Sequence, residues 1–488
     1  MIESVPVAGP PLLEDYEAYA HLAPAVRDLR DEAAMLVPRV GGRKVWMVNS
    51  TARGGGVAEM LPGLVSGLRQ VGVEAEWLVA ATGRHEFFAL TKRLHNLIHG
   101  TGDPRLGEDD AALYRAVSAA LAGELAERIG PEDLVVVHDP QPMGAGALLR
   151  ERLPVRTLWR CHIGLDRCTE ETRAAWDFLA PYAAAYDHAV FSAPEYIPDV
   201  FAGRATLIRP AIDPLAHKNR ELPPTKLQGI LCNAALARQH APVLTPAFER
   251  PARRLAPDGR WLPATEEDEL GVLFRPVVTQ VSRWDRLKGF APLLQAFVHL
   301  KRRPDRGEDP RHRRRRELLR LILAGPEPEA VADDPEGREV LESLRQAYFA
   351  LPPELQRAVA LISLPMSSRR ENALMVNALQ RCSSVVVQNS LEEGFGLTVA
   401  EAMWKRTAVL GSHACGIRQQ IHHGIDGHLV RDPEDPEGLA DALDGLLADA
   451  NERERLAAAA QRRVYAEFLV FAQIRAWLRL MAQTVSPM

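Results

Sequence analysis

The stretch SVVVQNSLEEGFGLTVAE, residues 384–401, joins an apolar strand to the start of a helix through a glycine turn. Its β-branched run predicts a strand buried on both faces, and the two glycines allow the chain to turn sharply after it. We expect the helix to open at Thr398. The backbone amides of the turn would then point into a ligand site and hold phosphate or sugar oxygens. These amides belong to Gly394, Phe395, Gly396, Leu397 and Thr398.

Two glutamates bracket this turn. Glu393 precedes the GFGL sequence, and Glu401 lies one turn into the predicted helix. Carboxylates at these places can accept hydrogen bonds from vicinal hydroxyls. A solvated helical glutamate is the alternative interpretation of Glu401 alone. Two glutamates around GFGL, directly after a buried strand, favour a binding site.

Short apolar runs alternate with longer amphipathic segments on both sides of this stretch, which predicts doubly wound, mostly parallel α/β sheets. We expect two such domains, because the chain has 488 residues and a domain has roughly 150. The proline-rich segment 210–270 has no clear period and is predicted to be a linker with irregular structure. Ligands of such sheets bind beyond the carboxyl ends of the strands, so we expect a cleft between the domains. The strands are predicted at residues 44–50, 74–81, 133–140, 156–162 and 188–193, and then at 277–283, 319–325, 359–365, 384–390 and 407–412.

The composition excludes several classes of protein. Lys and Arg total 59 and Asp and Glu total 64, so the formal charge of 59 − 64 = −5 gives no general attraction to nucleic acid or to a membrane. A hydrophobic fraction of 47% excludes disorder of the whole chain. The sequence contains no apolar span of 20 residues, so no membrane-spanning helix is predicted. The five cysteines include no CxxC pair, so neither a disulfide framework nor a structural metal is expected. The N-terminal residues match neither a signal nor a transit peptide, and we expect a cytoplasmic protein.

Two further loops carry candidate binding residues. Arg283 and Lys288 belong to the sequence RWDRLKG at the end of a predicted strand, and the two cations can converge on one anion such as a diphosphate. Gly54, Gly55 and Gly56 follow the strand at residues 44–50 and let a ligand approach the backbone at a helix N-terminus. The alternative interpretation of RWDRLKG is an ordinary surface loop, and that of the glycine loop is a tight turn. Neither GxGxxG nor a P-loop is present, which argues against a dinucleotide oxidoreductase.

Residues 301–316, KRRPDRGEDPRHRRRR, carry nine basic and three acidic side chains. We expect a solvated surface loop here, because charge runs usually face water. A site for a polyanion or a protein partner is the alternative, although no aromatic residue is interleaved for stacking on nucleic acid. Residues 462–483 are amphipathic and are predicted to form one final helix.

The combination of E-G-F-G-L-x-x-x-E with R-x-x-x-x-K-G resembles the retaining GT-B glycosyltransferases of family 4. Within that family, the chain from about residue 45 to 430 resembles the trehalose glycosyltransferring synthases, and fungal-type trehalose phosphorylases share much of the pattern. The additional segments that carry this resemblance are HDPQP (138–142), WRCHI (159–163), PAIDP (210–214), VNALQR (376–381) and NSLEEGFGLTVAEAMWK (389–405).

The resemblance implies a GT-B fold of two Rossmann-like domains. Residues 1–215 would form the acceptor domain, with a C-terminal helix at about 465–488 packing back onto it, and residues 216–464 would bind the nucleotide-sugar donor. Arg283 and Lys288 would neutralise the donor diphosphate. Glu393 and the following amides would hold the donor glucose, and Glu401 would hold the ribose.

The resemblance also implies roles for residues of the first domain. His162 would lie against the donor hexose, Asp139 would bind hydroxyls of the acceptor glucose, and the Gly54–Gly56 loop would close the phosphate and acceptor side. His138 is expected to be a structural histidine. One departure stands at residues 415–418, where this chain has CGIR and related synthases often have G-G-I, which leaves the preference for the donor base open.

The implied reaction moves α-glucose from a nucleotide-glucose to free glucose by front-face displacement, with retention and with no cofactor or metal ion. A phosphorylase that uses glucose 1-phosphate, a transferase with another sugar acceptor, and a catalytically silent sugar-nucleotide sensor are the alternatives. The sequence leaves open the nucleotide base, the direction of the reaction and the oligomeric state, and it is compatible with a homodimer.

Overall fold

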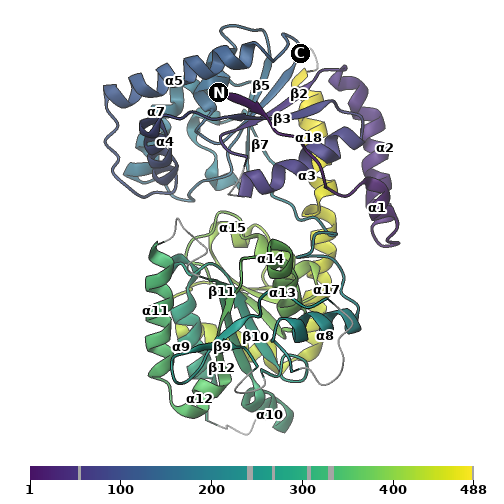
Figure 1. Cartoon of the computed structure of the whole chain (residues 1–488), viewed down its shortest axis with the longest axis vertical. Coiled ribbons are helices and arrows are strands. Elements are labelled where there is room, and N and C mark those ends of the chain that lie inside the picture. Colours follow the sequence, from purple (N-terminus) through teal and green to yellow (C-terminus); the bar gives the residue numbers. More distant parts are fainter. Residues whose placement is uncertain (53–55, 239–245, 266–269, 305–308, 328–334, 486–488) are drawn as a thin grey trace. The chain divides into compact units, whose positions relative to one another are not determined.

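The computed structural model describes residues 1–52, 56–238, 246–265, 270–304, 309–327 and 335–485. The chain divides into two compact units. Unit 1 comprises Met1–Asp213 together with Glu467–Met488, and unit 2 comprises Pro214–Ala466. Each unit is an α/β structure built around one sheet, with helices on both faces (Figure 1).

The sheet of unit 1 has seven strands in the order β1-β3-β2-β4-β5-β6-β7, and only β1 is antiparallel to its neighbour. Its strands are β1 (Ile2–Ser4), β2 (Val45–Asn49), β3 (Ala75–Ala80), β4 (Leu134–His138), β5 (Arg156–Arg160), β6 (His188–Phe191) and β7 (Ala205–Leu207). Its helices are α1 (Leu13–Glu17), α2 (Ala23–Val40), α3 (Gly56–Gln70), α4 (His85–Ile98), α5 (Glu108–Ala126), α6 (Met143–Leu149), α7 (Glu170–Ala183) and α18 (Val470–Val485), with 3₁₀ turns at Pro194–Tyr196 and Asp199–Phe201.

The sheet of unit 2 has eight strands in the order β15-β14-β13-β10-β11-β12-β8-β9, parallel from β15 to β12. Its strands are β8 (Arg253–Leu255), β9 (Trp261–Pro263), β10 (Val277–Val281), β11 (Arg320–Pro326), β12 (Val359–Leu364), β13 (Val385–Gln388), β14 (Ala408–Ser412) and β15 (His428–Val430). Its helices are α8 (Pro224–Asn233), α9 (Phe290–Arg302), α10 (Pro310–Leu318), α11 (Pro335–Phe349), α12 (Pro353–Ala358), α13 (Arg369–Cys382), α14 (Leu397–Trp404), α15 (Cys415–Arg418), α16 (Pro436–Ala448) and α17 (Ala450–Glu467), with a 3₁₀ turn at Arg286–Lys288.

Each sheet reverses its strand order once, and ligands of doubly wound sheets bind beyond the carboxyl ends of the strands at such a point. In unit 1 the reversal lies between β2 and β4, and in unit 2 it lies between β10 and β13. The candidate residues predicted from the sequence follow these four strands, in addition to β5. The predicted fold class, two Rossmann-like doubly wound sheets, is confirmed, and all ten predicted strands are present.

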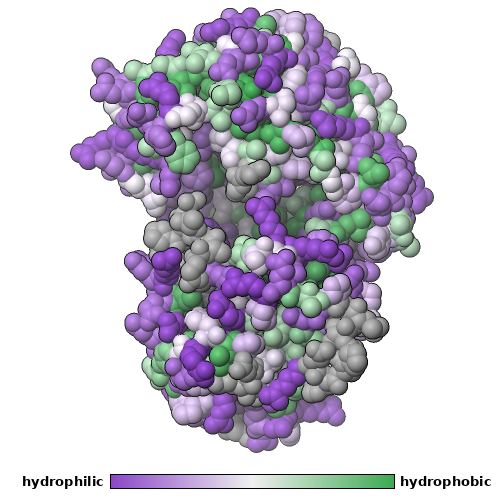
Figure 2. Space-filling model, viewed as in Figure 1, coloured by the Kyte–Doolittle hydropathy of each residue, from purple (hydrophilic) through white to green (hydrophobic). Residues whose placement is uncertain are grey.

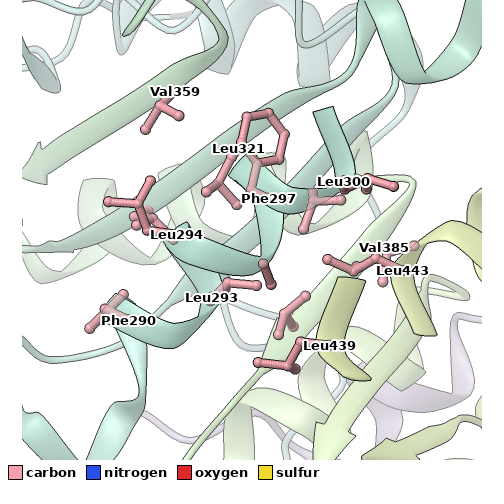
Figure 3. Close-up of a cluster of buried hydrophobic side chains, with 14 of the residues drawn as sticks. Phe290, Leu293, Leu294, Phe297, Leu300, Leu321, Val359, Val385, Leu439 and Leu443 are labelled. Atoms are coloured by element: carbon pink, nitrogen blue, oxygen red, sulfur yellow. The ribbon is translucent and has the colours of Figure 1, made fainter. Parts of the chain in front are cut away.

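The core of unit 2 explains how one of these loops is held. Helix α9 starts directly after the loop that contains Lys288, and its apolar face packs onto the sheet (Figure 3). Phe297 of α9 is fully buried beside Leu321 of β11, and α16 covers the same cluster through Leu439 and Leu443. Because such cores are densely packed, the start of α9 cannot move without disturbing the cluster.

The segment predicted to be an irregular linker, residues 210–270, contains more structure than expected. Helix α8 begins with two prolines, and β8 and β9 form an antiparallel hairpin that extends the sheet beside β12. Strands of three residues are too short to show a period, so no strand could be predicted here from the pattern of residues.

The prediction of a solvated surface loop at residues 301–316 is wrong in part. Within the described part, residues 310–318 form helix α10, and both His312 and Arg316 are buried. Two side chains of the run, Arg303 and His312, contact carboxylates of α16. Asp444 contacts Arg303 at 3.0 Å and His312 at 2.9 Å, and Arg303 also pairs with Asp441.

The prediction of one continuous helix over residues 462–483 is also wrong. Helix α17 ends at Glu467 and α18 begins at Val470, because the residues between them pair with an extended segment of unit 1. Ile212 donates its N–H to the carbonyl of Phe468 at 2.8 Å, and it accepts from the N–H of Val470 at 3.2 Å. Helix α18, yellow in Figure 1, then packs against α2 and α3.

The surface carries interspersed hydrophilic and hydrophobic residues on the face shown in Figure 2. Among the described residues, no helix combines the length and the apolar character needed to cross a bilayer.

Candidate functional site

The loops that follow β10 and β13 interlock in unit 2. We call residues 282–289 and 389–396 the loop pair. The side chain of Gln280 bridges them, since its amide nitrogen donates to the carbonyl of Lys288 at 2.6 Å and its oxygen accepts from the N–H of Asn389 at 3.1 Å. The N–H of Leu391 donates to the carbonyl of Leu287 at 2.7 Å. These bonds hold the two loops in one arrangement.

Gly289 shows how closely the two loops approach. Its φ of 61° is a left-handed conformation that favours glycine. A Cβ at this position would overlap the carbonyl oxygen of Asn389 and would lie 2.8 Å from its side-chain nitrogen. The glycine of the R-x-x-x-x-K-G sequence is therefore required both by its backbone angle and by the neighbouring loop.

Lys288 and Glu393, two residues singled out from the sequence, are in contact. Lys288 Nζ lies 2.8 Å from Glu393 Oε2, and each side chain is only 14% exposed. The same carboxylate oxygen accepts from Ser390 Oγ at 2.9 Å and from Gln388 Nε2 at 3.4 Å. This network fixes a carboxylate and an ammonium group side by side at the reversal of the sheet.

Arg283 belongs to the same loop but has a different environment. Its side chain is 62% exposed, and it forms an ion pair with Asp285 at 3.8 Å. The neighbouring Trp284 is buried and donates its indole N–H to the carbonyl of Pro326 at 2.8 Å. The tryptophan anchors this loop, and the mostly exposed Arg283 side chain follows the end of β10 directly before it.

The glycine turn after β13 is clamped by residues of α15 and the turn that follows it. Helix α14 begins at Leu397, one residue before the predicted start, and Gly396 caps it with a φ of 78°. The amide nitrogen of Gln420 donates to the carbonyls of Phe395 and Gly396. Gly416 donates its N–H to the carbonyl of Glu393 at 2.9 Å. The N-terminus of α14, whose first N–H groups lack partners within the helix, is thereby held in place.

Glu401 is not a solvated helical glutamate, so that alternative is wrong. The residue is 6% exposed, and Lys218 Nζ lies 3.6 Å from its Oε1. Lys405, one turn further along α14, donates to the carbonyl of Glu401 at 2.9 Å and to Asn219 Oδ1 at 3.3 Å. Burial lowers the pKa of Lys405 to about 7, while the negative charge of Glu401 opposes this shift. A buried carboxylate is thus placed beside Lys218, one turn into α14.

A second cluster lies in unit 1, at the carboxyl ends of β4 and β5. We call His138, Asp139, Arg160 and His162 the histidine cluster. Asp139 has a φ of 63°, unusual for a residue other than glycine, and its Oδ1 accepts from the N–H of His162 at 2.8 Å. Desolvation raises the pKa of Asp139 to about 6, against the opposing effects of the His162 amide and the Arg160 charge. The strained backbone and the raised pKa are typical of functional sites.

The two histidines of the cluster contact each other directly. His138 Nδ1 and His162 Nε2 are 2.9 Å apart, and the rings are nearly parallel, with an interplanar angle of 12°. Desolvation lowers the pKa of His138 to about 3 and lowers that of His162 well below its usual value, and the charge of Arg160 acts in the same direction. Both rings are therefore neutral at physiological pH.

The structure describes only part of the glycine loop. Gly54 and Gly55 lie outside the described residues. Gly56 is the first residue of α3, and a Cβ there would meet no atom within 4 Å among the described residues. The predicted role of this loop stays a prediction.

Sequence reasoning missed several residues of these clusters. Lys218 lies just beyond PAIDP, and a single lysine at that place shows no pattern that predicts its contact with Glu401. Gln420 holds the glycine turn from another loop, and no local sequence pattern predicts this contact. Arg160 could have been found, because it ends a predicted strand directly before the candidate His162, and a charged residue is rarely buried without a role.

Among the described residues, no group of three or more His, Cys, Asp or Glu side chains is arranged to hold a metal ion.

Two family models match the chain. "Trehalose synthase, N-terminal domain" matches residues 47–198, and "Glycosyl transferases group 1" matches residues 268–463. The first covers the histidine cluster and the second covers the loop pair. The match therefore includes both groups of residues described above.

Similar proteins cover almost the whole chain. A trehalose synthase of Rubrobacter xylanophilus is 35% identical over 464 residues, 94% of each chain, and one of Pyrococcus horikoshii is 31% identical over 479 residues, 97% of each. A trehalose phosphorylase of Pleurotus pulmonarius is 25% identical over 96% of this chain but only 61% of its own length. Among solved structures, the trehalose 6-phosphate synthase of Burkholderia multivorans has the same fold, with a TM-score of 0.63 at 18% identity, over 91% of this chain and 97% of that chain.

Proposed function

The chain belongs to the trehalose synthase family of GT-B glycosyltransferases, and from this premise we propose that it moves α-glucose from a nucleotide-glucose to free glucose, forming trehalose. The family membership makes it a trehalose-related hexosyltransferase. The nature of the donor, the acceptor and the residues that bind them are parts of the proposal.

The donor diphosphate binds at the loop pair in this proposal. Lys288 and the exposed Arg283 supply two positive charges, and the N-terminus of α14 supplies backbone N–H donors. The leaving diphosphate gains negative charge in the transition state, so fixed cations beside it lower the barrier. Removing one such group typically costs about 10²- to 10³-fold in kcat.

The donor sugar and the ribose bind through carboxylates. Glu393 accepts hydrogen bonds from hydroxyls of the donor glucose, since its Oε2 already faces Lys288 and Ser390 and its position is therefore fixed. Glu401 holds the ribose, and Lys218 Nζ lies 3.6 Å from its carboxylate. Ionised carboxylates are strong acceptors for paired hydroxyl groups.

The acceptor side of the reaction belongs to unit 1. His162 lies against the donor hexose, Asp139 binds hydroxyls of the acceptor glucose, and the loop of Gly54, Gly55 and Gly56 closes the phosphate side. The diphosphate leaves, an oxocarbenium-like species forms, and the acceptor hydroxyl attacks from the same face. A leaving phosphate oxygen takes the proton, so catalysis consists of positioning and charge stabilisation. Because Arg283 and Lys288 neutralise the diphosphate, the reaction as proposed needs no cofactor and no metal ion.

One observation carries this proposal: the contact between Lys288 and Glu393 at the point where the sheet of unit 2 reverses. A diphosphate needs a cation and a sugar needs a carboxylate. A nucleotide-sugar is a ligand that requires both within a few ångströms. The contact joins two loops that are 105 residues apart in sequence.

The test is a screen of donors with the purified full-length chain. ADP-, UDP- and GDP-glucose, and separately glucose 1-phosphate, are incubated with free glucose, and the disaccharide is identified by chromatography and by the NMR coupling of its anomeric protons. Trehalose from at least one nucleotide-glucose is the expected product. Trehalose from glucose 1-phosphate alone would replace the synthase with a phosphorylase, the activity that the Pleurotus relative's name carries. A different disaccharide, found when other sugars replace glucose, would change the acceptor.

Three variants separate an enzyme from a catalytically silent sugar-nucleotide sensor. Lys288→Met and Glu393→Gln are expected to lower kcat/KM by about 10²-fold or more. Arg302→Met removes an exposed cation at the far end of α9 and serves as the control, with unchanged kcat/KM. Full activity in both site variants would refute the assignment of the loop pair.

A further inference from the structure

The contact between His138 and His162 contains one proton. Both rings are neutral, and the 2.9 Å between His138 Nδ1 and His162 Nε2 requires one nitrogen to donate and the other to accept. Two arrangements exist. In the first, His138 donates from Nδ1 and leaves its own Nε2 as a bare acceptor. In the second, His162 donates from Nε2, and His138 must carry its proton on Nε2.

The surroundings of His138 Nε2 distinguish the two arrangements. His138 is 1% exposed, and its Nε2 has no hydrogen-bond partner among the described residues. In the second arrangement this atom would be a buried N–H without an acceptor, which costs about 1–3 kcal/mol. The first arrangement places only a lone pair there, and buried acceptors without partners are tolerated better than buried donors.

Arg160 favours the same arrangement. It is the register partner of His138 on the neighbouring strand β5, so both side chains lie on one face of the sheet. Arg160 is 1% exposed, donates from Nη2 to Ser192 Oγ at 2.9 Å, and has a buried Nη1 without a partner among the described residues. The positive charge of Arg160 acts on the His138 ring from the same face of the sheet, and it disfavours a ring that points a second N–H into this buried space.

We propose that His138 is a positioning residue that donates its Nδ1–H to His162 Nε2 and thereby holds His162 as the tautomer with its proton on Nδ1. His162 then presents an N–H, not a lone pair, to its ligand. The ligand atom that His162 recognises is an oxygen that accepts a hydrogen bond, such as a sugar hydroxyl or ring oxygen. This inference rests on the proposed function in one respect, the identification of the ligand as a hexose.

The backbone supports the same orientation of His162. Its N–H is held by Asp139 Oδ1 at 2.8 Å, and its ring is held by His138, so both ends of the residue are fixed. His162 is half-buried, and its Nδ1 has no partner among the residues that the structure describes. A fixed ring with one open donor selects for the position of an acceptor atom, because a ligand that covers the donor without accepting from it leaves the donor desolvated and unpaired.

The direct test is histidine ¹⁵N NMR of the full chain without substrate, with His162 assigned from the signals lost in His162→Asn. Protonated and unprotonated ring nitrogens have well-separated ¹⁵N shifts. We expect Nδ1 of His162 to be protonated and Nε2 to be bare near neutral pH. A His162 that carries its proton on Nε2 would overturn the inference. This readout does not depend on sugar transfer, so it stands even if the proposed reaction fails.

Three variants test the role of His138. His138→Leu removes the donor, and we expect His162 to shift toward the Nε2–H form and kcat/KM to fall by about tenfold or more. His138→Asn places an amide N–H near the Nδ1 position and should restore the Nδ1–H form and most of the activity. His188→Asn changes another half-buried histidine of the same sheet and should change neither readout. If His138→Leu leaves either the tautomer of His162 or kcat/KM as in the unchanged chain, the positioning role is refuted. If His138→Leu does not fold, the tautomer of His162 in the NMR spectrum of the unchanged chain decides whether the proposal holds.

Discussion

Replacing Gly416 with alanine tests whether the glycine turn must keep its position. A Cβ at Gly416 would lie 2.5 Å from the backbone nitrogen of Phe395 and 2.6 Å from the carbonyl carbon of Gly394, and still closer to Phe395 Cα. Carbon contacts are normally at least about 3.5 Å, so one of the two loops must shift by roughly 1 Å. All three contacts are to backbone atoms, and no side-chain rotation can relieve them.

Two consequences follow for Gly416→Ala. Overpacking of this kind costs about 1–3 kcal/mol, which corresponds to a Tm lower by roughly 2–12 °C in a domain of this size. A displacement of about 1 Å at the N-terminus of α14 also misplaces the donor, and we expect kcat/KM to fall by about 10²-fold. Thermal unfolding followed by circular dichroism and steady-state kinetics of sugar transfer measure the two effects separately.

Gly445→Ala is the matched control. Gly445 lies inside α16, and an added Cβ meets no described atom within 4 Å. Alanine stabilises a helix interior relative to glycine by about 0.5–1 kcal/mol, so Tm should stay or rise and kcat/KM should not change. If Gly416→Ala behaved like this control in both assays, the turn would not need the close approach seen here, and the reasoning would be refuted.

Two further variants follow from the charged clusters. Asp139 has a pKa raised to about 6, so its charged form is disfavoured in the fold and stability falls as pH rises from its unfolded value, about 4, to 6. Asp139→Asn should therefore raise Tm at pH 7–8, and this gain should disappear below about pH 4. Sugar transfer should fall. A gain in Tm that grows on acidification would contradict the predicted pH dependence of stability. Asp444→Ala removes the shared partner of Arg303 and His312 and should lower the free energy of unfolding by about 1–3 kcal/mol, measured by urea denaturation, with unchanged kcat/KM. A loss of less than 0.5 kcal/mol, the usual range of ordinary surface changes, would show that α10 is held by other contacts.

Local patterns in the sequence predicted the strands well. Parallel strands buried on both faces, such as residues 134–138 and 385–388, appear as apolar runs because every side chain on them meets a helix. The presence of a turn at Gly394–Gly396 before a helix was also predictable, since the glycines and the helix-forming residues are neighbours in the chain. The start of α14 was predicted to within one residue.

Features that depend on distant partners were predicted less well. The basic run at residues 301–316 looked solvated because its partners, Asp441 and Asp444, lie more than 120 residues away on α16. The final helix was predicted to be continuous because nothing in residues 462–483 indicates that Ile212 pairs with the backbone there. In each case the local propensity was overridden by a contact that exists only in the folded chain.

The sequence by itself therefore determined the strand–turn–helix units, the composition of their loops and the family resemblance, because these depend on spacing along the chain. Only the tertiary structure decided that Lys288 meets Glu393, that Glu401 is buried beside Lys218, and that His138 contacts His162. Parallel strands are joined through intervening helices, so residues at one edge of a sheet come from loops far apart in sequence. Their distances, burial and hydrogen-bonding roles are properties of that edge and not of any one segment.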